Sequence, residues 1–171
     1  MASDSGSAVL RVVVAAVVGA AAAVGGYAAG RDAAPVTASA SSRPGSEAAA
    51  AYLTIATAGN KQLDTDFDRV HGPDRSNLGA AKADLRDIAA TEHLFDSQLT
   101  ALTLPAGPEG WAHTLITVNE ARAALTTQAA ASTSLAQLAS YQSRLTAANV
   151  PVEQAVTAIR AELGLPAPDS D

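Results

Sequence analysis

A regular spacing of apolar residues between positions 78 and 102 constrains the fold of this chain most strongly. Successive members are separated alternately by three and four residues, which places them on one face of an α-helix as a heptad seam. One member of the seam, Glu92, is charged. The spacing predicts a long helix that packs against other helices, and the series is Leu78, Ala81, Leu85, Ile88, Glu92, Phe95, Leu99 and Leu102.

Three further segments show the same helical spacing. The first begins at Ser46, a favourable N-cap residue, and ends near His71, where Gly and Pro follow. The second follows the turn at 105–108. The third begins at Ser134 and its apolar phase continues across Pro151, which favours one kinked helix over two helices.

The sequence Gly164-Leu165-Pro166 ends the last helix with a left-handed Gly, an apolar residue that folds back and a Pro. Four helices joined by short turns predict an all-α fold, an antiparallel up-down-up-down four-helix bundle over residues 46–165. A disordered C-terminal tail is expected over 166–171. Abundant Ala and an aromatic content of 4% suit closely approaching helices and argue against a β-sandwich.

Residues 12–30 form an uncharged stretch of Val, Ala, Gly and one Tyr between two arginines. As a helix this stretch would span roughly 28 Å, close to the hydrocarbon thickness of a bilayer. It is long for the apolar core of a signal peptide, so the sequence favours a single retained N-terminal transmembrane helix. Cleavage as a secretory signal is the alternative, because small residues such as Ala38-Ser39-Ala40 follow it.

The segments that flank the apolar stretch complete the predicted organisation. Residues 1–11 form a short N-terminal tail, and residues 31–45 are rich in Ala, Ser and Pro and predict a flexible tether. The flanking arginines do not fix the orientation. Because short N-terminal tails usually stay in the cytoplasm, we expect the bundle outside the cytoplasmic membrane, or secreted if the segment is cleaved.

The charge of the bundle excludes several classes of partner. From Ser46 onward the chain carries eight Lys or Arg and fifteen Asp or Glu. Such an acidic domain is poorly suited to binding nucleic acid or an anionic lipid surface. The chain has no Cys, which excludes disulfides, a lipid-bearing Cys and thiolate metal sites.

Charged residues within the apolar seams predict a polar layer inside the bundle. In an antiparallel hairpin, residues at the same height have position numbers with a nearly constant sum. Across the turn at 103–110 this rule places Glu92 beside Arg122, and across the other turns it brings Gln142 and Thr57 to the same height. We expect a structural ion pair that fixes the helix register, and a ligand site is the alternative.

The end of the bundle opposite the anchor is the expected partner-facing tip. It contains the first turn of the bundle together with the turn near Ser132. Candidate contact residues in the first turn are His71, Asp74, Arg75 and Asn77.

The sequence contains no complete motif for metal binding or catalysis. The run Asp64-Thr65-Asp66-Phe67-Asp68 resembles the start of a calcium loop, but Arg69 stands at the Gly position and Arg75 at the twelfth. The three His residues lie far apart and outside zinc-protease or di-metal spacings. No nucleophile motif and no phosphate-binding glycine loop is present. The sequence predicts no metal, no cofactor and no enzymatic activity.

Several short stretches resemble a known group of proteins. They are Ala51-Tyr52-Leu53, residues 92–96, and residues 147–149 running on to Leu163-Gly164-Leu165-Pro166. In these stretches the chain resembles small exported or membrane-anchored helical-bundle proteins of high-GC actinobacteria, which have no described activity. The resemblance implies an extracytoplasmic helical bundle and supplies no catalytic residue.

The sequence as a whole favours a non-enzymatic interaction or structural module, tethered to the cytoplasmic membrane by residues 12–30 and facing an envelope protein. A ligand-sensing bundle that uses the polar layer is the competing hypothesis, and it requires a cavity between the helices.

Overall fold

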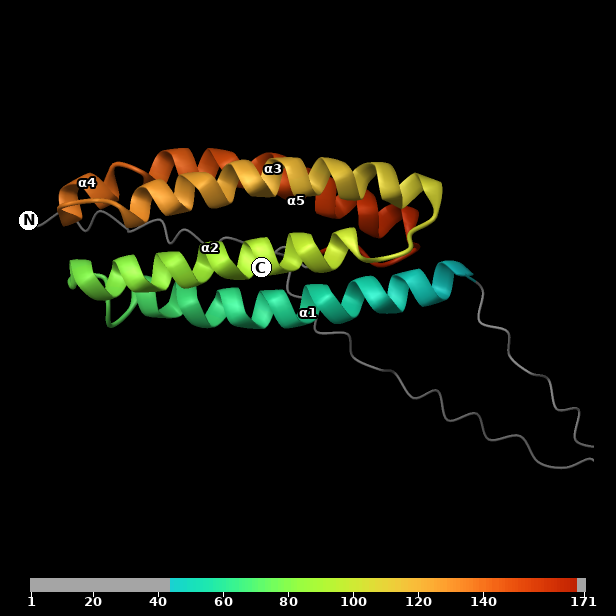
Figure 1. The fold of residues 1–171 in the computed structure, drawn as a ribbon, viewed down its shortest axis with the longest axis horizontal. Coiled ribbons are helices and arrows are strands. Elements are labelled where there is room, and N and C mark those ends of the chain that lie inside the picture. The colour runs from blue at the N-terminus through green and yellow to red at the C-terminus, as the bar shows by residue number, and fades with distance from the viewer. Residues whose placement is uncertain (1–43, 169–171) are drawn as a thin grey trace, which may run out of the picture.

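The computed structural model describes residues 44–168, and every regular element within this range is a helix. Four long helices, α1 (Pro44–His71), α2 (Leu78–Thr100), α3 (Ala106–Ala130) and α5 (Gln142–Glu162), pack side by side with alternating direction (Figure 1). A fifth short helix, α4 (Leu135–Ala139), lies between α3 and α5 at one end. The predicted all-α fold with four packed helices is therefore confirmed.

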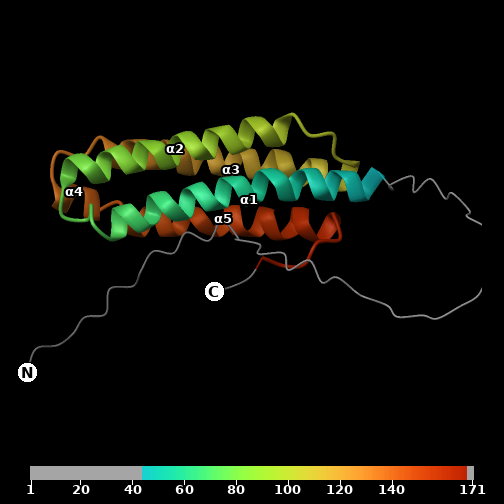
Figure 2. The same cartoon turned by 90° about the horizontal axis from the view of Figure 1, so that it is seen from below.

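The two ends of the bundle differ in what they contain. One end holds the start of α1, the connection between α2 and α3, and the end of α5 (Figure 2). The other end holds the turn between α1 and α2 together with α4. We call this second end the tip.

Side chains that cap the helix N-termini set the helix boundaries, and the sequence predicts some of these caps. The Asn77 side chain accepts a hydrogen bond from the Ala80 N–H (3.2 Å) and caps α2. The Ser134 hydroxyl likewise accepts from the Gln137 N–H (3.1 Å), as its spacing predicts. Helix α1 begins at Pro44, two residues before the predicted cap Ser46, and Pro suits the first turn of a helix because its missing N–H is not needed there.

The last predicted helix, expected to be one helix kinked at Pro151, is in fact two helices. Pro151 lies inside α5, so the helix does continue through it. The division falls instead at Ser140 and Tyr141, which makes α4 a separate helix. The Ser140 hydroxyl donates to the Gln137 carbonyl (2.6 Å), and such a local side-chain bond competes with continuation of the helix.

Helix α5 ends as the sequence predicts, at a left-handed Gly. Gly164 has φ +68°, the Gly164 N–H donates to the Ala161 carbonyl (3.1 Å), and the Leu165 N–H donates to the Arg160 carbonyl (2.8 Å). This is the Schellman arrangement, in which the left-handed residue and the residue after it each donate to a carbonyl of the last turn. The buried Arg160 adds a bond from Nε to the Pro166 carbonyl (2.6 Å) and fixes the following chain.

The apolar core consists of two clusters along the bundle axis. The larger cluster lies away from the tip and includes Tyr52, Phe95, Leu115 and Ile159. The smaller one lies toward the tip and is formed by Leu63, Leu85, Ile88, Ala129 and Ala130. Between them lie the buried Glu92 and Arg122, which are described below.

Within residues 44–168 no helix combines the length and the apolar character needed to cross a bilayer. The predicted anchor or signal segment, residues 12–30, lies outside the described residues, as do the tail 1–11 and most of the tether 31–45.

The left-handed Gly164 gives a direct stability prediction. Replacing Gly164 with Ala meets no neighbouring atom within 4 Å but forces a Cβ into the left-handed region, so we expect a loss of roughly 1 kcal/mol in the free energy of unfolding. Gly110→Ala is the matched control, because Gly110 lies inside α3 with the same open space and ordinary φ. Urea unfolding should show destabilisation for Gly164→Ala and a gain of up to about 1 kcal/mol for Gly110→Ala. Equal effects at both positions would contradict the proposed role of the C-terminal motif.

Candidate functional site

A buried ion pair joins α2 and α3 at mid-height of the bundle. Glu92 Oε1 lies 2.8 Å from Arg122 Nη2, and the two side chains are 1% and 3% exposed, respectively. The heptad phase turns both residues inward, and the antiparallel hairpin brings them to the same height. The structure thus brings together Glu92 and Arg122, the two charged residues that the sequence predicts to lie at the same height.

Amide side chains and a second carboxylate extend this ion pair. Arg122 Nη1 donates to Asn149 Oδ1 on α5 (3.3 Å). Asn119 Nδ2 donates to both carboxylate oxygens of Asp96 (3.0 Å each), so α2 and α3 are joined a second time one turn away. We call these five buried residues, Glu92, Asp96, Asn119, Arg122 and Asn149, the charge network.

Two residues of the predicted polar layer do not belong to the charge network. Thr57 is exposed on α1, and Gln142 is exposed at the first turn of α5. The predicted heights assume short turns, whereas α4 lengthens the connection after α3 and moves Asn149, two turns beyond Gln142, to the level of Arg122. On α1, the buried Asn60 lines the same small cavity as Glu92 and Arg122.

Burial dominates the electrostatics of the charge network. Desolvation raises the pKa of Glu92 to about 7, against the opposing effect of Arg122 and with a further increase from Asp96. Desolvation also raises the pKa of Asp96 to about 6, while the hydrogen bond from Asn119 acts in the opposite direction. Both carboxyl groups therefore bind protons more tightly in the folded chain than in the unfolded chain.

The cavities beside the charge network are the size of single water molecules. Two cavities of about 20 Å³ each touch Glu92 and Arg122. A water molecule needs about 10–15 Å³ of such volume, so each cavity has room for one. Glu92 Oε2 and Arg122 Nε have no hydrogen-bond partner among the described residues, and a single water in such a cavity would satisfy them. A substrate or organic ligand does not fit here.

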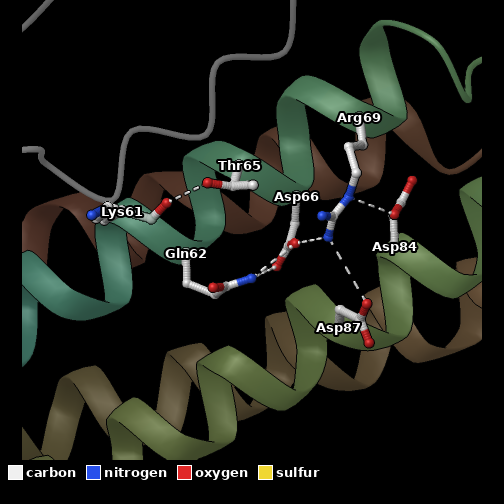
Figure 3. Close-up of polar contacts among 7 residues, drawn as sticks. All are labelled: Lys61, Gln62, Thr65, Asp66, Arg69, Asp84 and Asp87. Carbon is white, nitrogen blue, oxygen red and sulfur yellow. Dashed lines mark hydrogen bonds and ion pairs between the residues drawn. The ribbon is translucent and has the colours of Figure 1, made fainter.

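A second group of charges joins α1 to α2 near the tip (Figure 3). Asp66 is fully buried, accepts hydrogen bonds from Gln62 Nε2 (3.1 Å to each carboxylate oxygen) and pairs with Arg69. Arg69 Nε in turn donates to Asp84 Oδ1 on α2 (3.0 Å), and its Nη2 lies 4.0 Å from Asp87. Burial is the main reason that the pKa of Asp84 is raised, and the bond from Arg69 opposes this. The arrangement holds the two helices together and leaves Arg69 neutralised.

Sequence reasoning misses the role of Asp66. The residues around Asp66 resemble the start of a calcium loop, and this pattern gives no prediction that Asp66 is buried in a helix. The available signal is the spacing of three between Asp66 and Arg69, which puts both on one helix face beside Leu63 and Val70.

An open groove lies at the tip between α1, α2, α4 and the start of α5. Its volume is about 350 Å³, much larger than the cavities at the charge network. We call it the tip groove, and it is lined by Phe67, Val70, His71, Arg75, Leu85, Leu135, Leu138, Ala139, Gln142 and Leu145.

The four predicted contact residues at the tip divide into two pairs. His71 and Arg75 are exposed and line the tip groove. Asn77 caps α2, and Asp74 is half-buried in the turn, where the Asp74 N–H donates to the Arg69 carbonyl (3.0 Å). The first pair is available to a partner, and the second shapes the turn.

Among the residues that the structure describes, no group of three His, Asp or Glu side chains is arranged to hold a metal ion. Comparisons with known protein families, with proteins of described function and with solved structures give no match for this chain.

Double replacement tests the structural role of the buried ion pair. Glu92→Leu or Arg122→Leu alone leaves one uncompensated buried charge and should lower the free energy of unfolding by about 3–5 kcal/mol. The double variant removes both charges and should unfold within about 1 kcal/mol of the parent chain. Urea titrations of the three variants measure this. If neither single variant is less stable than the double variant, the pairing is wrong.

The raised carboxyl pKa values predict a pH dependence of stability. A carboxyl group with a higher pKa in the folded chain stabilises fully below its unfolded pKa, and this stabilisation is lost as pH rises through the folded value. Thus the free energy of unfolding should fall between about pH 4.5 and pH 7, by on the order of 3 kcal/mol from Glu92. Glu92→Gln should flatten this fall in urea titrations at several pH values. An unchanged slope in this variant would show that Glu92 does not titrate as described.

Proposed function

We propose that this chain is a non-enzymatic interaction module, tethered to the cytoplasmic membrane by residues 12–30 and displaying its bundle outside the cytoplasm. Its tip contacts a partner in the cell envelope. The observation that carries the proposal is the open tip groove, at the end of the bundle opposite the start of α1.

The geometry supports a tip that is held away from the membrane. The tether enters the bundle at the start of α1, and α1 is 28 residues long. At 1.5 Å per residue this helix places the tip groove roughly 40 Å from the point where the tether joins. A module of this shape presents the tip groove to partners at a distance from its own anchor.

The buried polar residues support a non-enzymatic role. Among the described residues, the charge network contains the two carboxyl groups whose pKa is raised most, and such groups are candidates for proton transfer. They are buried between helices beside water-sized cavities. Since a general acid or base must lie within hydrogen-bond reach of its substrate, we assign these groups to helix register rather than to catalysis.

Site-specific photo-crosslinking in intact cells tests the proposal. A photoreactive residue at Arg75 should crosslink the tagged full chain to a discrete partner, because Arg75 is exposed at the tip groove. The same residue at Thr103, exposed in the connection at the opposite end, is the control and should not give that product. The protein should fractionate with membranes, and protease added to intact cells should remove a C-terminal tag.

Two results would overturn the proposal. Protection of the tag until lysis would place the bundle in the cytoplasm. Equal crosslinking from both positions would show that the tip has no special role.

A further inference from the structure

The tip groove has the size and lining of a site for a small apolar group. Its volume of about 350 Å³ lies within the range of roughly 300–1,000 Å³ that is typical of small-molecule sites. Six of its ten lining residues have large apolar side chains, which are Phe67, Val70, Leu85, Leu135, Leu138 and Leu145. Leu135 on α4 is 39% exposed, so part of this apolar surface is open to solvent.

The charge of the tip groove is opposite to that of the chain. The whole sequence has 17 acidic and 11 basic residues, yet the lining of the tip groove includes His71 and Arg75 and no Asp or Glu. Arg69 is neutralised by Asp66 and Asp84 (Figure 3). Arg75, by contrast, forms no ion pair with a side chain of residues 44–168, so its positive charge is available to an anion.

The two basic residues suit a carboxylate or a similar anion. A guanidinium presents a planar set of donors that matches a carboxylate, and Arg75 is exposed at the rim. His71 is held beside it, because Nδ1 donates to the Phe67 carbonyl (3.0 Å) and the imidazole stacks on the Phe67 ring with the centroids 6.0 Å apart. An apolar groove with one cationic edge is complementary to a molecule with an apolar chain and an anionic head.

We propose that the tip groove binds a free single-chain amphiphile with an anionic head, such as a medium-chain fatty acid. The hydrocarbon chain lies against Phe67, Leu138 and Leu145, and the head lies at Arg75 and His71. This inference rests on the proposed function, since it assigns a ligand class to the same tip. It is compatible with the acidic surface of the bundle, because only the local charge of the groove contacts the head.

The absence of Cys from the chain allows a site-specific assay on the full chain in nanodiscs of zwitterionic lipid. Leu135→Cys places a thiol in the wall of the tip groove, and Leu94→Cys places one at an exposed leucine outside it (58% exposed). The measured quantity is the rate at which a polar maleimide modifies each thiol as octanoate, decanoate or dodecanoate is added. The expected result is that these acids slow modification of Leu135→Cys and leave Leu94→Cys unchanged.

Chain length and head charge give two further expectations. The half-protecting concentration should fall roughly fourfold for each added methylene until the groove is filled. Decyltrimethylammonium should protect at least tenfold more weakly than decanoate, although the chain as a whole is acidic.

Charge reversal tests the role of Arg75. In the Leu135→Cys background, Arg75→Glu should raise the half-protecting concentration of decanoate tenfold or more. Arg86→Glu is the matched control, because Arg86 is exposed on α2 and does not line the groove, and it should leave the concentration unchanged. Both side chains are exposed, so neither change threatens folding.

Four outcomes would overturn the inference. These are equal protection of both thiols, no protection by any acid, no effect of Arg75→Glu, and protection by nanodiscs of anionic lipid before any acid is added. The last would assign the groove to a bilayer surface. If a tip-specific crosslink persists while the acids fail to protect, the proposed function stands and this inference fails. If the acids protect while no tip-specific crosslink forms, the groove binds amphiphiles and the proposed interaction fails.

Discussion

The ion pair between Glu92 and Arg122 sets the register of the bundle. Both charges are removed from water, which is unfavourable unless they meet each other at hydrogen-bond distance. Sliding α2 against α3 by one turn would separate Glu92 from Arg122 and would also break the hydrogen bonds between Asn119 and Asp96. The apolar clusters on either side tolerate many arrangements of Leu and Ala, so the pair is the interaction that excludes alternative alignments. Asn149 extends the same constraint to α5 by accepting from Arg122.

Small side chains let the helices on both sides of α3 approach closely. Among the described helices, α3 packs most extensively, against α2 on one side and α5 on the other. Buried alanines such as Ala89, Ala123 and Ala155 account for this, because interaxial distance depends on the side chains at the contact. When the helices lie close together, side chains span a shorter distance to meet. A short side chain such as that of Asn119 can then donate a hydrogen bond to Asp96 across the interface.

Periodicity in the sequence predicts which residues face inward better than it predicts their heights. The seams place Glu92 and Arg122 inside, and both are buried. The height of a residue along the bundle axis depends on the length of each connection between helices. The sequence pattern predicts one helix from Ser134 onward, whereas α4 is a separate helix within the connection between α3 and α5. The misplacement of Gln142 follows from this one feature. Asp66 is missed for another reason, because an apolar seam does not predict a buried carboxylate, whose polar partners here are Gln62 and Arg69.

The tip groove lies beside α1 and α5, which pack less extensively than the other neighbouring long helices. The α1 and α5 backbones approach each other less than the other neighbouring pairs, and large side chains such as Tyr52 and Arg160 fill the space between them at the end away from the tip. Toward the tip the equivalent space is bounded by Phe67 and Leu145 and is covered only by the five residues of α4. A short helix with an exposed Leu135 cannot close this space as a full helix would. The helix break at Ser140 and Tyr141, which the sequence pattern does not predict, therefore also leaves an apolar groove open at the tip.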